Sequence, residues 1–404
     1  MRTVLFHSNR HADSGCVVIV VCIHGSEREC PCRIISRTDG LMNRVNAAIR
    51  LALVWSSLVL GFAVFSNGEL EAKELSGNDL LNIVGPDECG ECHKAEVHVW
   101  RETMHSKTFN VLTRKKRAKE IAGDMGIKRV KKAEACVTCH FTSGYRKNKV
   151  KAIAGVSCES CHGPAKTWLK VHGDYGGKNV TREQETPKHK ARRLAAIRDA
   201  GMIRPRNLYR LAANCYQCHI VSNEKLVNVG GHGPGNDDFE LVSWSLGEIR
   251  HKFLRSEGKK NEEVSRERQR MLYVVGKALD LEYGLRALAR VTKKGKYATA
   301  TVTRVQRVVN KLRTIYRLSP IPEVKKILAI IRSIDRKHRK EVLLAAADAI
   351  AVTTQRLAGT RDGSQLSALD RIIPQAEQYK GKPGGPPEQV ARHDLLSLVG
   401  RLNR

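Results

Sequence analysis

The spacing Cys-x-x-Cys followed at once by His occurs four times between residues 89 and 219. Two cysteines three residues apart lie near one turn of helix and can form thioethers with the two vinyl groups of one haem. The next residue, His, can then bind the iron from the same side. The sequence therefore predicts four covalently attached haem c groups, with iron as the metal. The attachment cysteines and proximal histidines are Cys89/Cys92/His93, Cys136/Cys139/His140, Cys158/Cys161/His162 and Cys215/Cys218/His219.

Zinc is the main alternative, because paired Cys-x-x-Cys motifs also form four-cysteine zinc sites. Such sites do not require His directly after every pair. The chain has twelve cysteines, and the four outside the motifs all precede Met42. No cysteine after Met42 is left for an ordinary disulfide framework. The pattern favours haem over zinc.

The segment 42–72 has the plan of a secretory signal peptide. It has a basic start, an apolar run over residues 51–65 and a small residue, Ala72, that could mark cleavage. The run is short for a spanning helix, which needs about 20 apolar residues, so an uncleaved membrane anchor is the alternative. Residues 1–41 lack this pattern and are interpreted as a non-native extension. The expected location is the periplasm or another exported compartment.

The expected fold is mainly α. Residues 73–259 hold the motifs and show no persistent strand pattern, which predicts a multihaem cytochrome c domain with little regular sheet. Within it, residues 92–112 have the pattern of one helix. Residues 260–404 lack cysteine and have apolar residues at helical spacing, which predicts an all-α, basic C-terminal bundle. Its expected helices cover residues 274–288, 302–316, 324–331 and 342–357, with a stop at Pro320 and Pro322.

The formal charge is +30 and the estimated pI is about 9.9. Such a cation is typical of proteins that bind acidic surfaces, although a solvated basic face without a partner is the alternative. We expect acidic redox proteins as partners, with an anionic membrane surface as a second choice and no nucleic acid. Aromatic residues make up only 5% of the chain, which indicates that haem fills part of the interior.

A haem iron has a sixth coordination position, and several side chains could fill it. If residues 92–112 form one helix, His105 lies about 18 Å along the axis from His93 and cannot reach the same iron. It could bind a neighbouring haem. His189 lies in a run of basic residues, which favours a solvated side chain. The candidates are His98, His105, His172, His189, His232 and His251, with Met104, Met125 and Met202.

The segment 89–96, followed by Trp100 and by residues 103–105, resembles the start of the tetrahaem cytochrome c family that serves hydroxylamine oxidation in ammonia-oxidising bacteria. The segment 155–164, with His172 after it, resembles the same family. The order of the four motifs also fits. The resemblance covers about residues 85–255 and does not extend over the C-terminal bundle.

That resemblance implies three bis-histidine haems and one five-coordinate iron. The implied pairs are His105 with His162, His172 with His219, and His251 with His93. The haem on His140 would then be open. The glycine-rich loop 230–235 departs from the family pattern, because it supplies an extra histidine, His232, that could cap an iron instead.

The resulting functional prediction is a periplasmic tetrahaem cytochrome that transfers electrons between redox partners in respiratory nitrogen metabolism. The alternative is a multihaem reductase that acts on nitric oxide, nitrite or hydroxylamine at one open iron. Related nitrite reductases carry a Cys-x-x-Cys-Lys haem and a fifth haem, and this sequence has neither. The electron carrier is therefore favoured over the enzyme.

Overall fold

The computed structural model describes residues 77–235, 239–335 and 340–386. These residues lie in one compact unit, Leu70–Arg404. The expected extension, signal peptide and cleavage site all lie outside the described residues.

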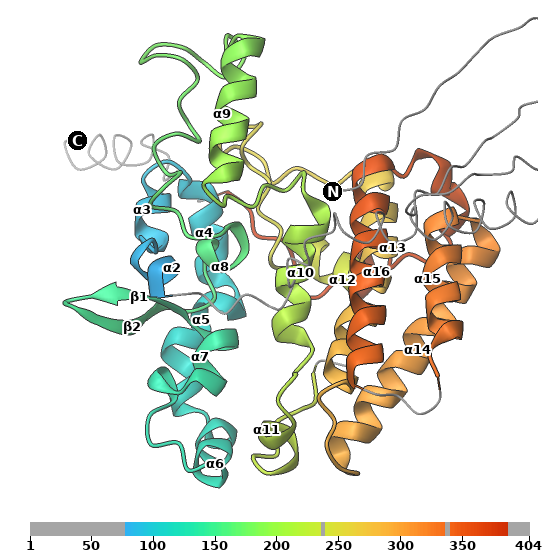
Figure 1. Cartoon of the computed structure of the whole chain (residues 1–404). Coiled ribbons are helices and arrows are strands. Elements are labelled where there is room, and N and C mark those ends of the chain that lie inside the picture. The colour runs from blue at the N-terminus through green and yellow to red at the C-terminus, as the bar shows by residue number, and fades with distance from the viewer. Residues whose placement is uncertain (1–76, 236–238, 336–339, 387–404) are drawn as a thin grey trace, which may run out of the picture. The chain divides into compact units, whose positions relative to one another are not determined.

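Two groups of helices make up this unit (Figure 1). The motif region contains short helices: α2 (Gly77–Leu81), α3 (Pro86–Gly90), α4 (Lys94–Glu102), α5 (Met104–Val111), α6 (Lys116–Asp124), α7 (Glu134–His140), α8 (Cys158–His162), α9 (Pro187–Asp199), α10 (Leu208–His219), α11 (Glu224–Asn228) and α12 (Leu241–Leu246). The bundle contains four helices, three of them with more than 20 residues: α13 (Arg266–Leu288), α14 (Lys296–Leu318), α15 (Pro322–Ser333) and α16 (Lys340–Thr360). The prediction of a mainly α fold is confirmed.

The helices α13, α14, α15 and α16 confirm the helical segments predicted for the bundle. α14 ends at Leu318 and α15 begins at Pro322, as the proline stop predicts. α13 packs against α14 and α16, and most of its residues are buried. α16 is long and apolar enough to cross a membrane by composition, but it packs on α13 and α15 as a core helix of the bundle.

The apolar core of the bundle continues into the motif region. One cluster of buried side chains includes Tyr216 of α10 and Leu241 of α12 together with residues of all four helices of the bundle. Both helices contact α13. The packing therefore crosses residue 259, where the sequence predicts a domain boundary, and that boundary stays a prediction.

The motif region has little apolar core of its own. Apart from the bundle cluster, its buried apolar clusters are small: Ala95, Val99 and Phe253 form one, and Ala165, Trp168 and Ile197 form another. Short helices with so few buried apolar contacts need another source of cohesion. Large apolar macrocycles held among them would supply it.

The sheet content of the described residues is one antiparallel hairpin, β1 (Thr142–Arg146) with β2 (Lys149–Ala154). Lys147 and Asn148 at its tip both have positive φ, the backbone that a two-residue hairpin turn requires. The hairpin joins the second motif to the third.

The prediction of one helix over residues 92–112 is wrong. Thr103 has an extended backbone and separates α4 from α5. Its hydroxyl donates to the Trp100 carbonyl and accepts from the Ser106 amide, at 2.7 and 3.3 Å. A Thr that caps a new helix in this way competes with helix continuation, and the break redirects His105.

Candidate haem sites

Each Cys-x-x-Cys-His motif lies at the end of a helix. The histidine is the last residue of α7, α8 and α10, and His93 directly precedes α4. All eight motif cysteines are free thiols in the structure. A helix that ends at the histidine lets the ring turn toward a group attached to the preceding turn.

Cys92 differs from the other attachment cysteines. Cys92 is exposed, whereas the other seven motif cysteines are partly buried. The reason is local: α3 ends at Gly90, so Cys92 lies in the turn before α4 and not in a helix that ends at the histidine. A thioether at Cys92 would therefore lie at the solvent-facing edge of the first site, and its attachment role stays a prediction.

Each motif histidine faces a second histidine from a distant segment. The distances between ring centres are 6.1 Å for His93 and His172, 6.2 Å for His105 and His219, 6.2 Å for His140 and His232, and 6.4 Å for His162 and His251. Rings in direct stacking contact lie closer, as His219 and Phe239 do at 4.2 Å. The four pairs therefore leave a gap between their rings.

That gap has the width of one metal ion with two axial imidazoles. An imidazole nitrogen lies about 2 Å from a bound transition metal, and the ring centre lies about 1 Å behind the nitrogen, so two axial rings have centres about 6 Å apart. The eight histidines that the sequence singled out thus come together as four pairs with this spacing. The residues fit haem iron.

The pairing differs from the one that the resemblance implied. His105 faces His219 rather than His162, His172 faces His93 rather than His219, and His251 faces His162 rather than His93. His232 lies opposite His140, which matches the alternative that the extra histidine of the loop 230–235 offered.

Local contacts explain the new pairs. The Thr108 hydroxyl of α5 donates to the His140 carbonyl at 2.9 Å, which holds α5 near the end of α7. The Lys166 amide donates to the Asn82 carbonyl at 3.0 Å, which places the segment that carries His172 beside the first motif. Both contacts join segments that are distant in sequence, so spacing alone could not show them.

The loop with His232 is fixed by three contacts. The backbone N–H of His232 donates to the Leu226 carbonyl at 3.1 Å. Gly235 pairs with Ile220 as an isolated β-bridge, directly after the fourth motif. Arg117 of α6 donates to the Gly231 carbonyl. Gly231 has φ of 66°, a conformation that favours glycine.

Second contacts orient four of the rings. The Nδ1 atoms of His162, His172, His232 and His251 lie 2.9, 2.5, 2.7 and 2.6 Å from backbone carbonyls. A carbonyl partner makes Nδ1 the protonated nitrogen and leaves the lone pair on Nε2 for a metal. Nδ1 of His93 faces the Glu96 carboxylate at 3.8 Å instead.

Burial favours the neutral imidazole that metal binding requires. It lowers the pKa of His219 to about 4, and it also lowers the pKa values of His105, His140 and His162. The Glu96 carboxylate raises the pKa of His93. Most of the paired rings are therefore ready to bind at neutral pH without losing a proton.

Three buried donors near the pairs have no partner among the described residues: Trp168 Nε1, Trp244 Nε1 and Arg250 Nε. The Trp168 ring lies 5.4 Å from His172, the Trp244 ring lies 5.1 Å from His219, and Arg250 precedes His251. Unpaired buried donors are costly, and haem carries two propionate carboxylates that could accept from them. The sequence interpretation missed these three residues, since nothing in their spacing marks them.

The other candidate axial ligands lie outside the pairs. His98 is exposed, and His189 is bound to Glu185 at 2.9 Å. Met104 is 52% exposed. Met125 lies under Gly230 and Met202 lines a surface groove. Within the described residues, no group of three or more His, Cys, Asp or Glu side chains could hold a metal ion. These residues therefore do not form a four-ligand zinc site.

Residues 88–163 match the family model described as cytochrome c554 and c-prime. The first three motifs therefore lie in a segment that is similar to cytochrome c554. Cytochrome c-554 of Nitrosomonas europaea is 33% identical over 112 residues, which are 26% of this chain and 48% of that protein. The chain thus spans about half the length of this curated relative.

No solved structure matches the chain. The cytochrome c554 relation supports covalently bound c-type haem at the motifs that it covers. The family match ends after the third motif and does not include the bundle. The assignment of a haem to the fourth motif therefore depends on the histidine geometry described above.

Proposed function

We propose that this protein is a periplasmic tetrahaem c-type cytochrome that carries electrons between redox partners in respiratory nitrogen metabolism. The main support for this proposal is the set of four histidine pairs, whose ring centres lie 6.1–6.4 Å apart. Haem supplies the one-electron chemistry when bound. The chain would attach each haem through the two cysteines of a motif and would hold its iron between the two histidines of a pair.

The motifs lie in contact along one path. The helix of the first motif, α3, contacts α8 of the third motif, and α7 of the second motif contacts α10 of the fourth. The Asn214 amide of α10 donates to the Cys161 carbonyl at 2.8 Å, which joins the third motif to the fourth. The adjacency supports electron transfer in the order first, third, fourth and second motif, or the reverse.

If each histidine pair held one haem iron, no coordination position would remain for a substrate. His232 opposite His140 is the decisive residue, because this was the iron that could have been open. The arrangement supports a carrier over a reductase of nitric oxide, nitrite or hydroxylamine. Bis-histidine ligation also favours low potentials, since Met ligation raises them.

Acidic redox proteins are the proposed partners. The charge of +30 would steer an acidic protein toward the surface and support a short-lived complex. An anionic membrane surface is the second choice. The periplasmic location is inferred from the signal-like segment 42–72 and from the cytochrome c554 relation.

Haem stoichiometry and spin state test the proposal. A pyridine haemochrome assay with mass spectrometry of the mature chain should give four covalent haems. Electron paramagnetic resonance of the oxidised protein should show low-spin signals alone. Two haems or fewer would refute the tetrahaem assignment. A high-spin ferric signal together with turnover of nitric oxide, nitrite or hydroxylamine would favour the reductase.

A further inference from the structure

A surface groove of about 360 Å³ lies between the end of α9 and the start of α10. Apolar side chains line it in part, among them Leu194 and Met202. Four arginines line it: Arg198, Arg204, Arg206 and Arg210. We call this the arginine groove. No histidine of the four pairs lines it, and the proposed haem chemistry uses none of these arginines.

Most of this positive charge is not neutralised within the described residues. Arg198 pairs with the neighbouring Asp199 at 2.9 Å, whereas Arg204, Arg206 and Arg210 make no ion pair there. Arg206 and Arg210 are exposed. Burial, together with the nearby charges of Arg193 and Arg206, lowers the pKa of Arg204. An anion in the groove would reduce this repulsion between like charges.

The N-terminus of α10 adds to the same field. Asn207, its N-cap residue, lines the groove, and its side chain accepts from the Arg210 amide at 3.2 Å. The first turn of a 12-residue helix carries partial positive charge that favours anions. Arginine also binds carboxylates in a planar, two-bond geometry that lysine cannot match. The groove therefore suits carboxylates.

The groove is connected directly to one histidine pair. The Ile203 carbonyl accepts from His162 Nδ1 at 2.9 Å, and the Ile203 amide donates to the His162 carbonyl at 2.8 Å. Ile203 lies between Met202 and Arg204, which both line the groove. A partner seated there would lie next to the third haem motif.

We propose that the arginine groove binds an acidic segment of the redox partner and places that partner beside the haem of the His162 and His251 pair. This inference rests on the proposed electron-transfer function. A lining of arginines and apolar side chains matches a peptide segment in which carboxylates flank apolar side chains. Arginine is also enriched at protein interfaces.

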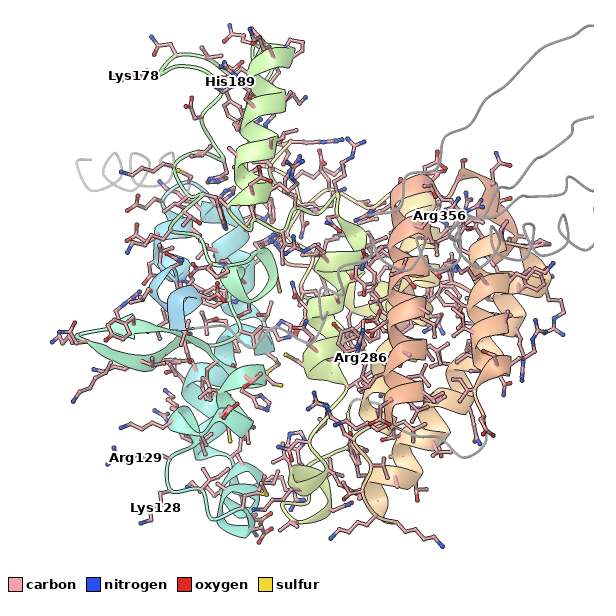
Figure 2. The ribbon with its side chains drawn as sticks, viewed as in Figure 1. Lys128, Arg129, Lys178, His189, Arg286 and Arg356 are labelled. Atoms are coloured by element: carbon pink, nitrogen blue, oxygen red, sulfur yellow. The ribbon has the colours of Figure 1, made fainter. Side chains whose placement is uncertain are left out.

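The test uses the full-length holoprotein and a fluorescent octa-aspartate peptide at low ionic strength. Arg206→Gln with Arg210→Gln should weaken peptide binding about fivefold, as the loss of two exposed ion pairs predicts. The matched control is Lys128→Gln with Arg129→Gln, which removes the same charge beside α6, far from α9 (Figure 2). The control should change binding less than about twofold.

Equal weakening by both double variants would overturn the inference, because it would mean that total charge and not the groove holds the peptide. Loss of binding to phosphatidylglycerol vesicles, with peptide binding retained, would also overturn it and would assign the groove to a membrane. Haem count and low-spin signals measured on the same samples keep the two proposals distinct. If the haem count and the low-spin signals remain normal while the groove variant binds the peptide as tightly as the natural protein, the inference fails and the carrier function stands.

Discussion

The imidazole rings of His140 and His232 face each other with their centres 6.2 Å apart, the spacing of two axial ligands on one iron. His140 ends the helix of the second motif, and His232 comes from a glycine-rich loop 92 residues later (232 − 140 = 92). This relationship separates a closed electron carrier from a cytochrome with an open iron.

Replacement of His232 should open that iron. His232→Ala removes the distal ligand and should add a high-spin ferric signal to the electron paramagnetic resonance spectrum, with a loss of about one quarter of the low-spin intensity, since one haem in four changes. His98→Ala is the matched control, because His98 is exposed and outside the pairs. An unchanged low-spin spectrum in His232→Ala would show that His232 is not a ligand.

Arg117 should act as a positioning residue for the same loop. It donates to the Gly231 carbonyl, next to His232. Arg117→Ala should speed the binding of carbon monoxide to the reduced protein about tenfold, since a hydrogen bond from a charged donor contributes roughly 1.5 kcal/mol. Stopped-flow spectroscopy measures this rate. Lys119→Ala on the same helix removes the same charge, and an equal effect there would exclude a specific role for Arg117.

Gly155 should be required for the position of His105. A Cβ at residue 155 would overlap the His105 carbonyl oxygen and would lie 2.6 Å from that of Ser106. Gly155→Ala should therefore displace α5, lower stability by about 1–3 kcal/mol and disturb the low-spin signal of the His219 haem. Gly123→Ala in α6 meets open space and should stabilise the protein by about 0.5–1 kcal/mol. Thermal unfolding of both variants makes the comparison, and equal stability would contradict the crowding.

Glu185 should make stability depend on pH below neutrality. Hydrogen bonds from Arg193 and His189 lower the pKa of this carboxyl to about 2. A depressed carboxyl pKa stabilises the fold fully above the unfolded value, near 4.5, and loses that effect as pH falls toward 2. Glu185→Gln should lower the Tm at pH 7, and the difference from the natural protein should shrink between about pH 4.5 and 2.

Arg193 also donates to the His172 carbonyl at 2.8 Å, so the same substitution should loosen the His93 and His172 pair. Glu183→Gln is the matched control, because Glu183 is exposed on the same segment. A Tm difference between Glu185→Gln and the natural protein that stays constant across this pH range would contradict the assignment.

The sequence by itself showed the four Cys-x-x-Cys-His motifs, predicted the eight histidines as a set of candidate ligands and predicted the four helices of the bundle. These features depend on local patterns: the attachment spacing is set by one haem, and the apolar spacing is set by the helix period. Tertiary structure alone decided which histidines face each other. The apolar spacing predicted one helix over residues 92–112, but Thr103 ends the first helix and caps a second one. The hydrogen bonds of Thr108 and Lys166 join segments that are distant in sequence.

The exposure of Cys92 and the position of His232 opposite His140 were decided in the same way. The spacing of the first motif is identical to that of the others, yet only the fold leaves Cys92 in an exposed turn. The sequence likewise showed that the loop 230–235 carries a spare histidine but not where it lies. Its position depends on contacts with Arg117, Leu226 and Ile220, which bring α6, α11 and the end of α10 to one place. Axial ligation joins residues through space, and spacing along the chain does not encode that geometry.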